Sequence, residues 1–252
     1  MDDSAALQPT SRISGAERAA REDLAACYRL VADYGWDDLA GTHISHIVPG
    51  EEAFLLNPLG IIFEQITASC LMKISFDGEV LEKTSYALNA AAFTIHSAVH
   101  QARRDVGCVI HLHTQHGMAV SALEEGLLPL TQSAAVVMDD LVYHDYEGIA
   151  LNLEERERLQ RDLGDHNMMI LRNHGTLVVG DTAAQAFKRL YMLEKACEMQ
   201  CLTLGMGRPL RPMPPEALTQ IQSLKIRSTG HNDLMWEGLR QRLEGREPSY
   251  RS

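Results

Sequence analysis

We predict an α/β fold for this chain: one three-layer α/β/α domain around a mixed, largely antiparallel central sheet. Strand-like and helix-like spacings of apolar residues alternate along the sequence, as they do when strands and helices share one core. Several strand-like runs are joined by turns too short for a crossover helix, which excludes an all-parallel sheet. We expect residues 1–13 to be a flexible segment and residues 14–252 to form this single domain, including its C-terminal helices.

The first part of the chain is predicted to form a helix, several strands and a second helix. Ser14 and Glu17 have the spacing of a capping box before a helical run at 19–34. Pro49–Gly50 supplies a turn between two strand-like runs. Thr67 is expected to cap a short helix. The strands expected here are 39–48, 53–56, 71–76 and 79–81, and the second helix is 88–103.

The second part continues the alternation. Asp181 or Thr182 is predicted to cap a long helix that runs to about residue 204. A proline-rich stretch then precedes two amphipathic pieces that we expect to dock as terminal helices. The strands expected in this part are 106–113, 134–142 and 168–171, and the helices are 117–123, 153–163, the long helix, 218–226 and 234–243.

The net charge and the composition of the chain favour small-molecule chemistry. The 252 residues carry a formal charge of -11 without any cluster of Lys and Arg, which disfavours nucleic acid or an anionic membrane as a partner. No apolar run approaches the roughly 20 residues that cross a bilayer. The polar start, Met1 to Ser14, lacks an export signal, so we expect a cytoplasmic protein.

The cysteines do not form a recognisable site. They are odd in number and lack paired C-x-x-C spacing, so neither a disulfide framework nor a thiolate zinc site is predicted. We interpret them as packed side chains in a reducing compartment. The five are Cys27, Cys70, Cys108, Cys197 and Cys201.

Three histidines are the strongest candidates for chemistry. His111 and His113 end a predicted strand, and side chains two residues apart on a strand face the same side. His174 follows a buried strand, and Gly175 permits a tight turn that aims its ring. Three imidazoles without a fourth ligand fit an open, catalytic metal site. Packing or hydrogen bonding at a strand tip remains the alternative interpretation of an H-x-H pair alone.

Four stretches together resemble the class II aldolase/adducin family, and the resemblance runs from about Leu24 through the C-terminal helices. The stretches are Gly41–Ser45, Asn57–Gly60 with Glu64 and Thr67, Asp105–Thr114, and Leu171–Gly175. The resemblance implies a mixed-sheet α/β/α fold and usually a homotetramer with sites at subunit interfaces. It also implies that His111, His113 and His174 hold one divalent ion, with zinc expected first and manganese, iron or cobalt as alternatives.

The sequence departs from the sugar-phosphate aldolases of that family. When Asp105 and His111 are aligned without gaps, the position of the family's catalytic glutamate falls on Ala92. The phosphate-binding serines fall on Ala90 and Ala91, the threonine of the first phosphate loop falls on Leu59, and the asparagine of the G-N-x-S stretch falls on His43. We therefore expect a substrate without phosphate. The retained metal site without the glutamate resembles a divergent branch that contains decarboxylases and a mononuclear iron oxygenase.

Another group must then move protons. His43 is the first candidate, because the alignment places it at a substrate-facing position and imidazole titrates near neutral pH. Tyr143 is a weaker catalytic candidate, as are its neighbours His144 and Tyr146. Glu64 is expected to cap a helix or support the site rather than react.

Helical spacing also singles out His96 and His100, which lie four residues apart. That spacing permits metal binding, but we expect these two to pack against the sheet.

The leading hypothesis is a metal-dependent carbon–carbon lyase, of aldolase or decarboxylase type, that acts on a small hydroxy- or oxo-acid, aromatic or not. A second hypothesis keeps the three imidazoles and assigns them to Fe(II) that activates dioxygen. A third is a non-catalytic scaffold like adducin, the cytoskeletal relative. We expect a homo-oligomer, most simply the family's tetramer.

Overall fold

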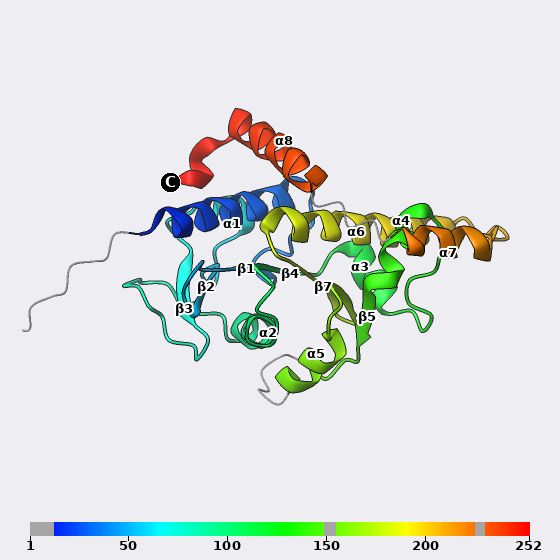
Figure 1. The fold of residues 1–252 in the computed structure, drawn as a ribbon, viewed down its shortest axis with the longest axis horizontal. Coiled ribbons are helices and arrows are strands. Elements are labelled where there is room, and N and C mark those ends of the chain that lie inside the picture. The colour runs from blue at the N-terminus through cyan, green and yellow to red at the C-terminus, as the bar shows by residue number, and fades with distance from the viewer. Residues whose placement is uncertain (1–12, 149–154, 225–229) are drawn as a thin grey trace, which may run out of the picture.

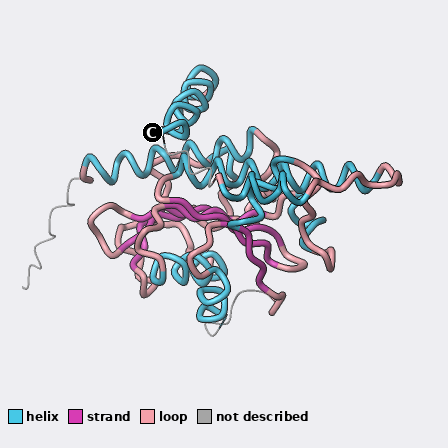
Figure 2. Tube along the Cα trace, turned by 45° about the vertical axis from the view of Figure 1, so that its right-hand side comes forward, coloured by secondary structure: helices cyan, strands magenta, loops and turns pink. Residues whose placement is uncertain are grey.

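A computed structural model of the chain describes residues 13–148, 155–224 and 230–252. One seven-stranded sheet lies between two layers of helices, which confirms the predicted three-layer α/β/α fold (Figures 1 and 2). Every neighbouring pair of strands is antiparallel except β5 and β6, so the sheet is mixed and largely antiparallel as predicted. From edge to edge the strands are β3 (Met72–Ser75), β2 (Ala53–Leu56), β1 (His43–Ile47), β4 (Cys108–Leu112), β7 (Gly175–Gly180), β6 (Met168–Leu171) and β5 (Leu141–His144).

The helices divide between the two faces of the sheet. Figure 1 shows α1 (Gly15–Asp33) and α6 (Ala183–Gly205) on one face, with α8 (Gly230–Arg246) stacked over them. The opposite face is covered by α2 (Ala90–Ala102) and α5 (Glu155–Leu163), which pack on each other. The remaining elements are α3 (Gln115–Ser121), α4 (Gln132–Val137), α7 (Pro215–Ser223) and the 3-10 turns η1 (Phe63–Gln65), η2 (Met138–Asp140) and η3 (Pro248–Arg251). In the described part of the chain, no helix is long and apolar enough to span a bilayer.

The start of α1 confirms half of the predicted capping box. The Ser14 hydroxyl accepts a hydrogen bond from the Glu17 amide at 3.0 Å, as an N-cap should. The Glu17 carboxylate does not return to Ser14; it accepts from Arg21 at 2.9 Å and from Lys73 at 3.1 Å. Glu17 therefore ties α1 to β3, and these two cations hold the pKa of its carboxyl below the usual value against the opposing effect of burial.

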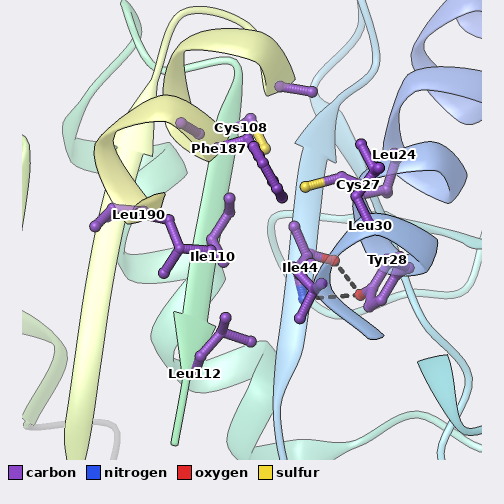
Figure 3. Close-up of a cluster of buried hydrophobic side chains, with 14 of the residues drawn as sticks. Leu24, Cys27, Tyr28, Leu30, Ile44, Cys108, Ile110, Leu112, Phe187 and Leu190 are labelled. Carbon is purple, nitrogen blue, oxygen red and sulfur yellow. Dashed lines mark hydrogen bonds between the residues drawn. The ribbon is translucent and has the colours of Figure 1, made fainter. Parts of the chain in front are cut away.

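The main core lies between the sheet and the layer that contains α1 and α6. Leu24, Cys27 and Leu30 project from α1, and Phe187 and Leu190 project from α6 (Figure 3). They meet the side chains of the central strands that point to this face, which are Ile44, Cys108, Ile110 and Leu112. All of these side chains are fully or almost fully buried. Removing their apolar surface from water is the main favourable free energy of this layer.

The opposite face of β4 packs on α2. Val109 is buried with Ile95 and Val99 of α2 and with Leu177 and Val179 of β7. Side chains of a strand alternate between faces. The odd-numbered positions of β4 therefore point toward α2, whereas the even-numbered positions point toward α6.

One predicted strand was wrong, and one observed strand was not predicted. Residues 134–142 were expected to form one strand, but Thr131 accepts a hydrogen bond from the Ala134 amide and starts helix α4, so only β5 is extended. A short apolar run does not distinguish a strand from a buried helical turn. Strand β7 was not predicted, although Gly175–Gly180 contains a run of buried β-branched residues. This short run lies between the turn that contains His174 and the cap of α6, and the pattern of neither neighbour indicated a strand.

Smaller differences concern the edges of elements. Strand β1 begins only at His43, because residues 38–41 form a turn in which Leu39 has a φ of 52° and the Gly41 amide donates to the Asp38 carbonyl at 2.7 Å. The expected strand 79–81 is reduced to a bridge between Ile74 and Val80. Thr67 precedes a turn rather than a helix.

Parts of some predictions lie outside the described residues. These are the flexible segment over residues 1–12, the first two residues of helix 153–163 and the end of helix 218–226.

Tyr28 connects α1 to the strand that carries His43. Its buried hydroxyl accepts a hydrogen bond from the Ile44 amide at 2.7 Å and donates to the carbonyl of the same residue (Figure 3). The Asn57 side chain lies 2.8 Å from the same hydroxyl. A side chain thus satisfies backbone groups of β1 that β2 does not pair, because the β1–β2 register begins only at Ser45.

We predict that Tyr28→Phe lowers the free energy of unfolding by about 1–3 kcal/mol, because it leaves a buried amide without a partner. Chemical denaturation followed by circular dichroism measures the change. Tyr86→Phe is the matched control, since Tyr86 is exposed and its hydroxyl makes no hydrogen bond with the described residues; it should change stability by less than about 0.5 kcal/mol. Equal stability of the two variants would show that the Tyr28 hydroxyl does not stabilise the start of β1.

Candidate metal centre

His111 lies on the central strand of the sheet and is nearly inaccessible to solvent. In the antiparallel register it sits opposite His43 of β1 on one side and Leu177 of β7 on the other. Its Nδ1 atom lies 3.0 Å from the carbonyl oxygen of Thr176. A carbonyl only accepts, so Nδ1 carries the proton and Nε2 keeps its lone pair. This backbone contact selects the tautomer that a metal ligand needs.

His113 follows β4 and is half-buried. Its Nδ1 atom lies 3.0 Å from Oδ2 of Asp38, a carboxylate that accepts the ring proton. Its Nε2 atom is buried and has no hydrogen-bond partner within the described ranges. A buried polar atom without a partner is costly, and coordination of a cation would satisfy this one. The Asp38 contact also orients the ring, as carboxylates do behind metal-bound histidines.

His174 reaches the same place from the turn between β6 and β7. The turn is tight: Leu171 pairs with Gly175 across it, and the His174 amide donates to the Leu171 carbonyl at 3.1 Å. Asn173 takes the left-handed conformation, with φ 56°. A Cβ on Gly175 would collide with the carbonyl of Leu112, so only glycine lets this turn approach the end of β4 so closely.

These three histidines, predicted from the sequence, lie together as a triad. Each offers one ring nitrogen, and the three nitrogens lie within 4.8 Å of one another. The ring centroids are 4.7 to 5.1 Å apart. No other group of three or more metal-binding side chains is found in the parts of the chain that the structure describes. Three imidazoles that surround one point could hold one divalent ion and leave positions for water or substrate.

The electrostatics suit a cation. Burial, reinforced by the neighbouring imidazoles, lowers the pKa of His111 well below its ordinary value. The same causes lower the pKa of His174 to about 4. Both rings are therefore neutral near pH 7, and only neutral imidazole has a nitrogen lone pair to coordinate a metal.

His43 lies beside the triad, with its ring centroid 5.0 Å from that of His111. It is almost completely buried, and loss of solvation together with nearby imidazoles holds its pKa well below the usual range. Its Nδ1 atom lies 2.7 Å from Nε2 of His96 on α2. Among the four groups considered from sequence for acid–base work, His43 is the one that the fold places against His111.

His96 and His100 are buried between α2 and the sheet, as predicted, but they do more than pack. Nδ1 of His96 lies 2.5 Å from the Ser45 hydroxyl, and Nε2 of His100 lies 2.8 Å from the same oxygen. Sequence reasoning missed this connection. Two signals could have indicated it: Ser45 shares a strand face with His43, and residues 96 and 100 share a helix face.

Of the two tyrosines considered as catalytic candidates, Tyr146 lies nearer to the triad than Tyr143. The structure does not bring Tyr143 to the triad: its hydroxyl accepts from the Leu127 amide at 2.9 Å, and its ring lies 4.1 Å from the Arg172 guanidinium carbon. It faces the main core, on the side of the sheet away from His111. Tyr146 is exposed and lies 6.4 Å from the His174 ring centroid.

The two remaining candidates, His144 and Glu64, form no hydrogen bond with the triad histidines within the described residues. His144 lies 2.8 Å from the Asp162 carboxylate. Glu64 is exposed in η1.

A small pocket of about 10 Å³ lies beside one member of the triad, and it is lined by His144, Tyr146, Arg172 and His174 among others. A cavity of about 700 Å³ lies at the other end of the sheet, beside Arg103 and Asp181, and none of the triad lines it. We place the chemistry at the triad because the donor groups converge there, whereas the larger cavity holds no such cluster.

We predict that Asp38→Asn weakens the affinity for zinc by about 10- to 100-fold. The uncharged amide oxygen of Asn accepts a weaker hydrogen bond from the His113 ring than the carboxylate does, so the ring is oriented less firmly. Competition with a chelator measures the dissociation constant. Asp37→Asn is the matched control, since no interaction with Asp37 occurs within the described residues. Equal affinities for the two variants would show that Asp38 does not support the ring.

Comparison with known proteins identifies a family and named relatives. The family described as Class II Aldolase and Adducin N-terminal domain matches residues 22–201. A Caulobacter vibrioides protein provisionally named as a class 2 aldolase is 51% identical over 243 residues, which cover 95% of this chain and 94% of that protein. Mouse alpha-adducin is 42% identical over 193 residues, covering 75% of this chain but 26% of adducin.

Solved structures show the same fold. An aldolase II superfamily protein from Pseudomonas syringae superposes with a TM-score of 0.92 at 41% identity, covering 96% of this chain and 98% of that one. L-fuculose 1-phosphate aldolase from Glaciozyma antarctica superposes with a TM-score of 0.82 at 26% identity, covering 98% and 97%. The family match spans most of the chain and includes the triad, so this protein belongs to the class II aldolase and adducin family.

Proposed function

We propose that this protein is a metal-dependent carbon–carbon lyase, of aldolase or decarboxylase type, that acts on a small hydroxy- or oxo-acid without a phosphate group. The observation that carries the proposal is the convergence of His111, His113 and His174, with a buried and unpartnered Nε2 on His113. Coordination of a cation would satisfy that nitrogen, and a scaffold role gives it no purpose.

The donor set fits a divalent ion of the first transition row. Imidazole nitrogen suits zinc, iron and cobalt, and suits manganese less tightly. We propose zinc first, as three histidines with an open position are a common catalytic zinc set. When bound, such an ion supplies Lewis acidity: it polarises substrate oxygens and stabilises the negative charge that develops as the carbon–carbon bond breaks.

The chain's own residues would hold the substrate and move the proton. The position of the family glutamate is occupied by Ala92, which offers no carboxylate. Ala92 is fully buried among Phe54, Leu56 and Met72. One helical turn later His96 contacts His43. We propose His43 as the group that gives or takes the proton, through the Nε2 atom that α2 leaves free. The contacts of Tyr143 make it a poor second candidate.

The start of α2 supports a substrate without phosphate. In the alignment to the sugar-phosphate aldolases, the phosphate-binding serines fall on Ala90 and Ala91. The side chain of Asn89 accepts from the amides of Ala91 and Ala92, at 3.1 and 3.2 Å. Free amides at a helix start are what bind a phosphate, and here two of them are already satisfied.

A second copy of the chain is expected to complete the site. The family resemblance implies sites at subunit interfaces, and the pocket of this chain beside His174 is small, about 10 Å³. Two exposed aromatic or apolar side chains, Tyr146 and Leu59, are available for an interface. We propose a homo-oligomer, and a tetramer as its simplest form, with the substrate bound where copies meet.

We predict that His111→Ala removes both the bound metal and turnover while leaving the fold intact. The protein is purified without added metal, and the metal content per chain is measured by mass spectrometry. About one ion per chain is expected for the natural protein and for His166→Ala, a control whose ring is about half exposed and away from the triad. A full complement of metal in His111→Ala would contradict the proposed ligands.

We predict that phosphate confers no advantage on the substrate. A panel of short hydroxy- and oxo-acids is assayed for aldol cleavage and for carbon dioxide release, each beside its phosphorylated counterpart. The unphosphorylated member of each active pair should have at least as high a kcat/KM, because the α2 amides are already engaged by Asn89. A clear preference for the phosphorylated member would contradict this.

Two other functions have specific support. Three neutral donors with open positions also suit Fe(II), and oxygen uptake with iron alone would favour an oxygenase. The similarity to alpha-adducin favours a scaffold. A chain that neither retains nor regains a metal would favour that function over the lyase.

A further inference from the structure

Helix α3 is bonded to the backbone beside two of the candidate ligands. It begins directly after His113, with Thr114 as its N-cap residue. At its other end, the carbonyl oxygen of Ser121 accepts the Asn173 amide at 3.1 Å, and Asn173 directly precedes His174. Between these ends the helix packs on α6 and on β7 (Figure 1). One short helix therefore connects the end of β4 to the β6–β7 turn.

The middle of α3 lies against the strand residue that supports the third ligand. A Cβ added to Gly117 would overlap the Thr114 hydroxyl oxygen and would lie 2.9 Å from the Thr176 side chain. Only a residue without a Cβ lets α3 lie this close to β7. The carbonyl oxygen of Thr176 is the group that faces Nδ1 of His111. The position of α3 therefore bears on the backbone beside all three ligands.

A buried carboxylate on α6 fixes the start of α3. Glu194 is 2% exposed, and Thr114 is 1% exposed. One carboxylate oxygen of Glu194 accepts from the Thr114 hydroxyl at 2.5 Å, and the other oxygen lies 2.8 Å from Nδ1 of His116. Both contacts join α6 to the first two turns of chain after β4. Because a buried carboxylate oxygen without a donor is unfavourable, the protein maintains the Thr114 contact.

The Thr114 hydroxyl is used for this contact instead of for capping. A threonine at an N-cap usually accepts a hydrogen bond from an amide in the first turn of its helix. Thr114 has the extended backbone of an N-cap, yet its side chain caps none of the described amides of α3. A helix of seven residues is too short to be stable alone. Helix α3 therefore keeps its place through its contacts with α6 and β7.

We infer that Glu194, acting through Thr114, holds α3 in the position that sets the relative placement of His111, His113 and His174. Glu194 and Thr114 are thus positioning residues for the candidate metal centre. Ligands must be held within a fraction of an ångström for tight coordination, so a displaced α3 weakens metal binding. The inference rests on the proposed metal centre, and the experiments below separate the failure of one from the failure of the other.

The zinc affinity of the full chain, measured by competition with a chelator, tests the contact with Glu194. Thr114→Val replaces the hydroxyl by a methyl group of similar size, so the affinity should fall by about tenfold or more. Thr114→Ser keeps the hydroxyl and should bind zinc as the natural protein does. Thr94→Val is the matched control, because Thr94 is also buried and its hydroxyl donates to the Ala90 carbonyl within α2. It should leave the affinity unchanged.

Gly117→Ala tests the position of α3 without changing Thr114. The new Cβ must displace Thr114 or Thr176, which moves α3 away from β7, so the zinc affinity should again fall by about tenfold. Gly238→Ala in α8 is the matched control, since a Cβ there meets nothing within 4 Å beyond its own helix. The visible spectrum of Co(II) bound in place of zinc reports the arrangement of the ligands. It should change in Gly117→Ala and Thr114→Val only.

The results distinguish the positioning role from the metal centre itself. Weaker zinc binding and an altered cobalt spectrum in Thr114→Val and Gly117→Ala, but not in Thr114→Ser or the two controls, would support the inference. If the natural protein binds zinc and the two variants bind it equally tightly with the same cobalt spectrum, the metal centre stands and the role of Glu194 falls. If the natural protein binds neither ion, the proposed metal centre falls, and this inference falls with it.

Discussion

The pairing of β4 with β1 on one side and β7 on the other is the constraint on which the rest of the structure depends. Because the strand is held from both sides, its register cannot slip without exchanging its two faces. Ile110 and Leu112 are directed into the core beneath α6 and α1, and His111 is directed toward α2. A single strand thus builds the main core with alternate residues and presents the candidate metal ligand His111 on its other face.

The same pairing brings remote parts of the chain to one point. His43 is opposite His111 because β1 and β4 are antiparallel in that register. His174 arrives because Gly175 allows the β6–β7 turn to pass against the end of β4. Asp38 precedes β1 and supports His113 from outside the sheet. The strand register and the β6–β7 turn therefore bring the three histidines of the triad together.

Family membership and the residues of the site support different parts of the proposed function. The family includes both aldolases and adducins, and this chain resembles members of each. The triad supports the proposal of a metal site, because the buried Nε2 atom of His113 has no hydrogen-bond partner within the described residues. The apolar surroundings of Ala92 and the capped start of α2 support the proposal of a substrate without phosphate. The function that we propose from these features is a metal-assisted reaction in which a histidine, rather than a carboxylate, transfers the proton.

The sequence by itself determined the fold class, most of the helices and the three metal-ligand candidates. It could do so because strand alternation, helical periodicity and H-x-H spacing are local properties. It did not identify β7 or the helical nature of residues 132–137, since short buried runs look alike in either conformation. Only the tertiary structure decided which tyrosine approaches His174, that Asp38 supports His113, and that His96, Ser45 and His100 join His43. Those contacts link residues up to 75 positions apart, and their geometry depends on how helices settle on the sheet, which local spacing does not encode.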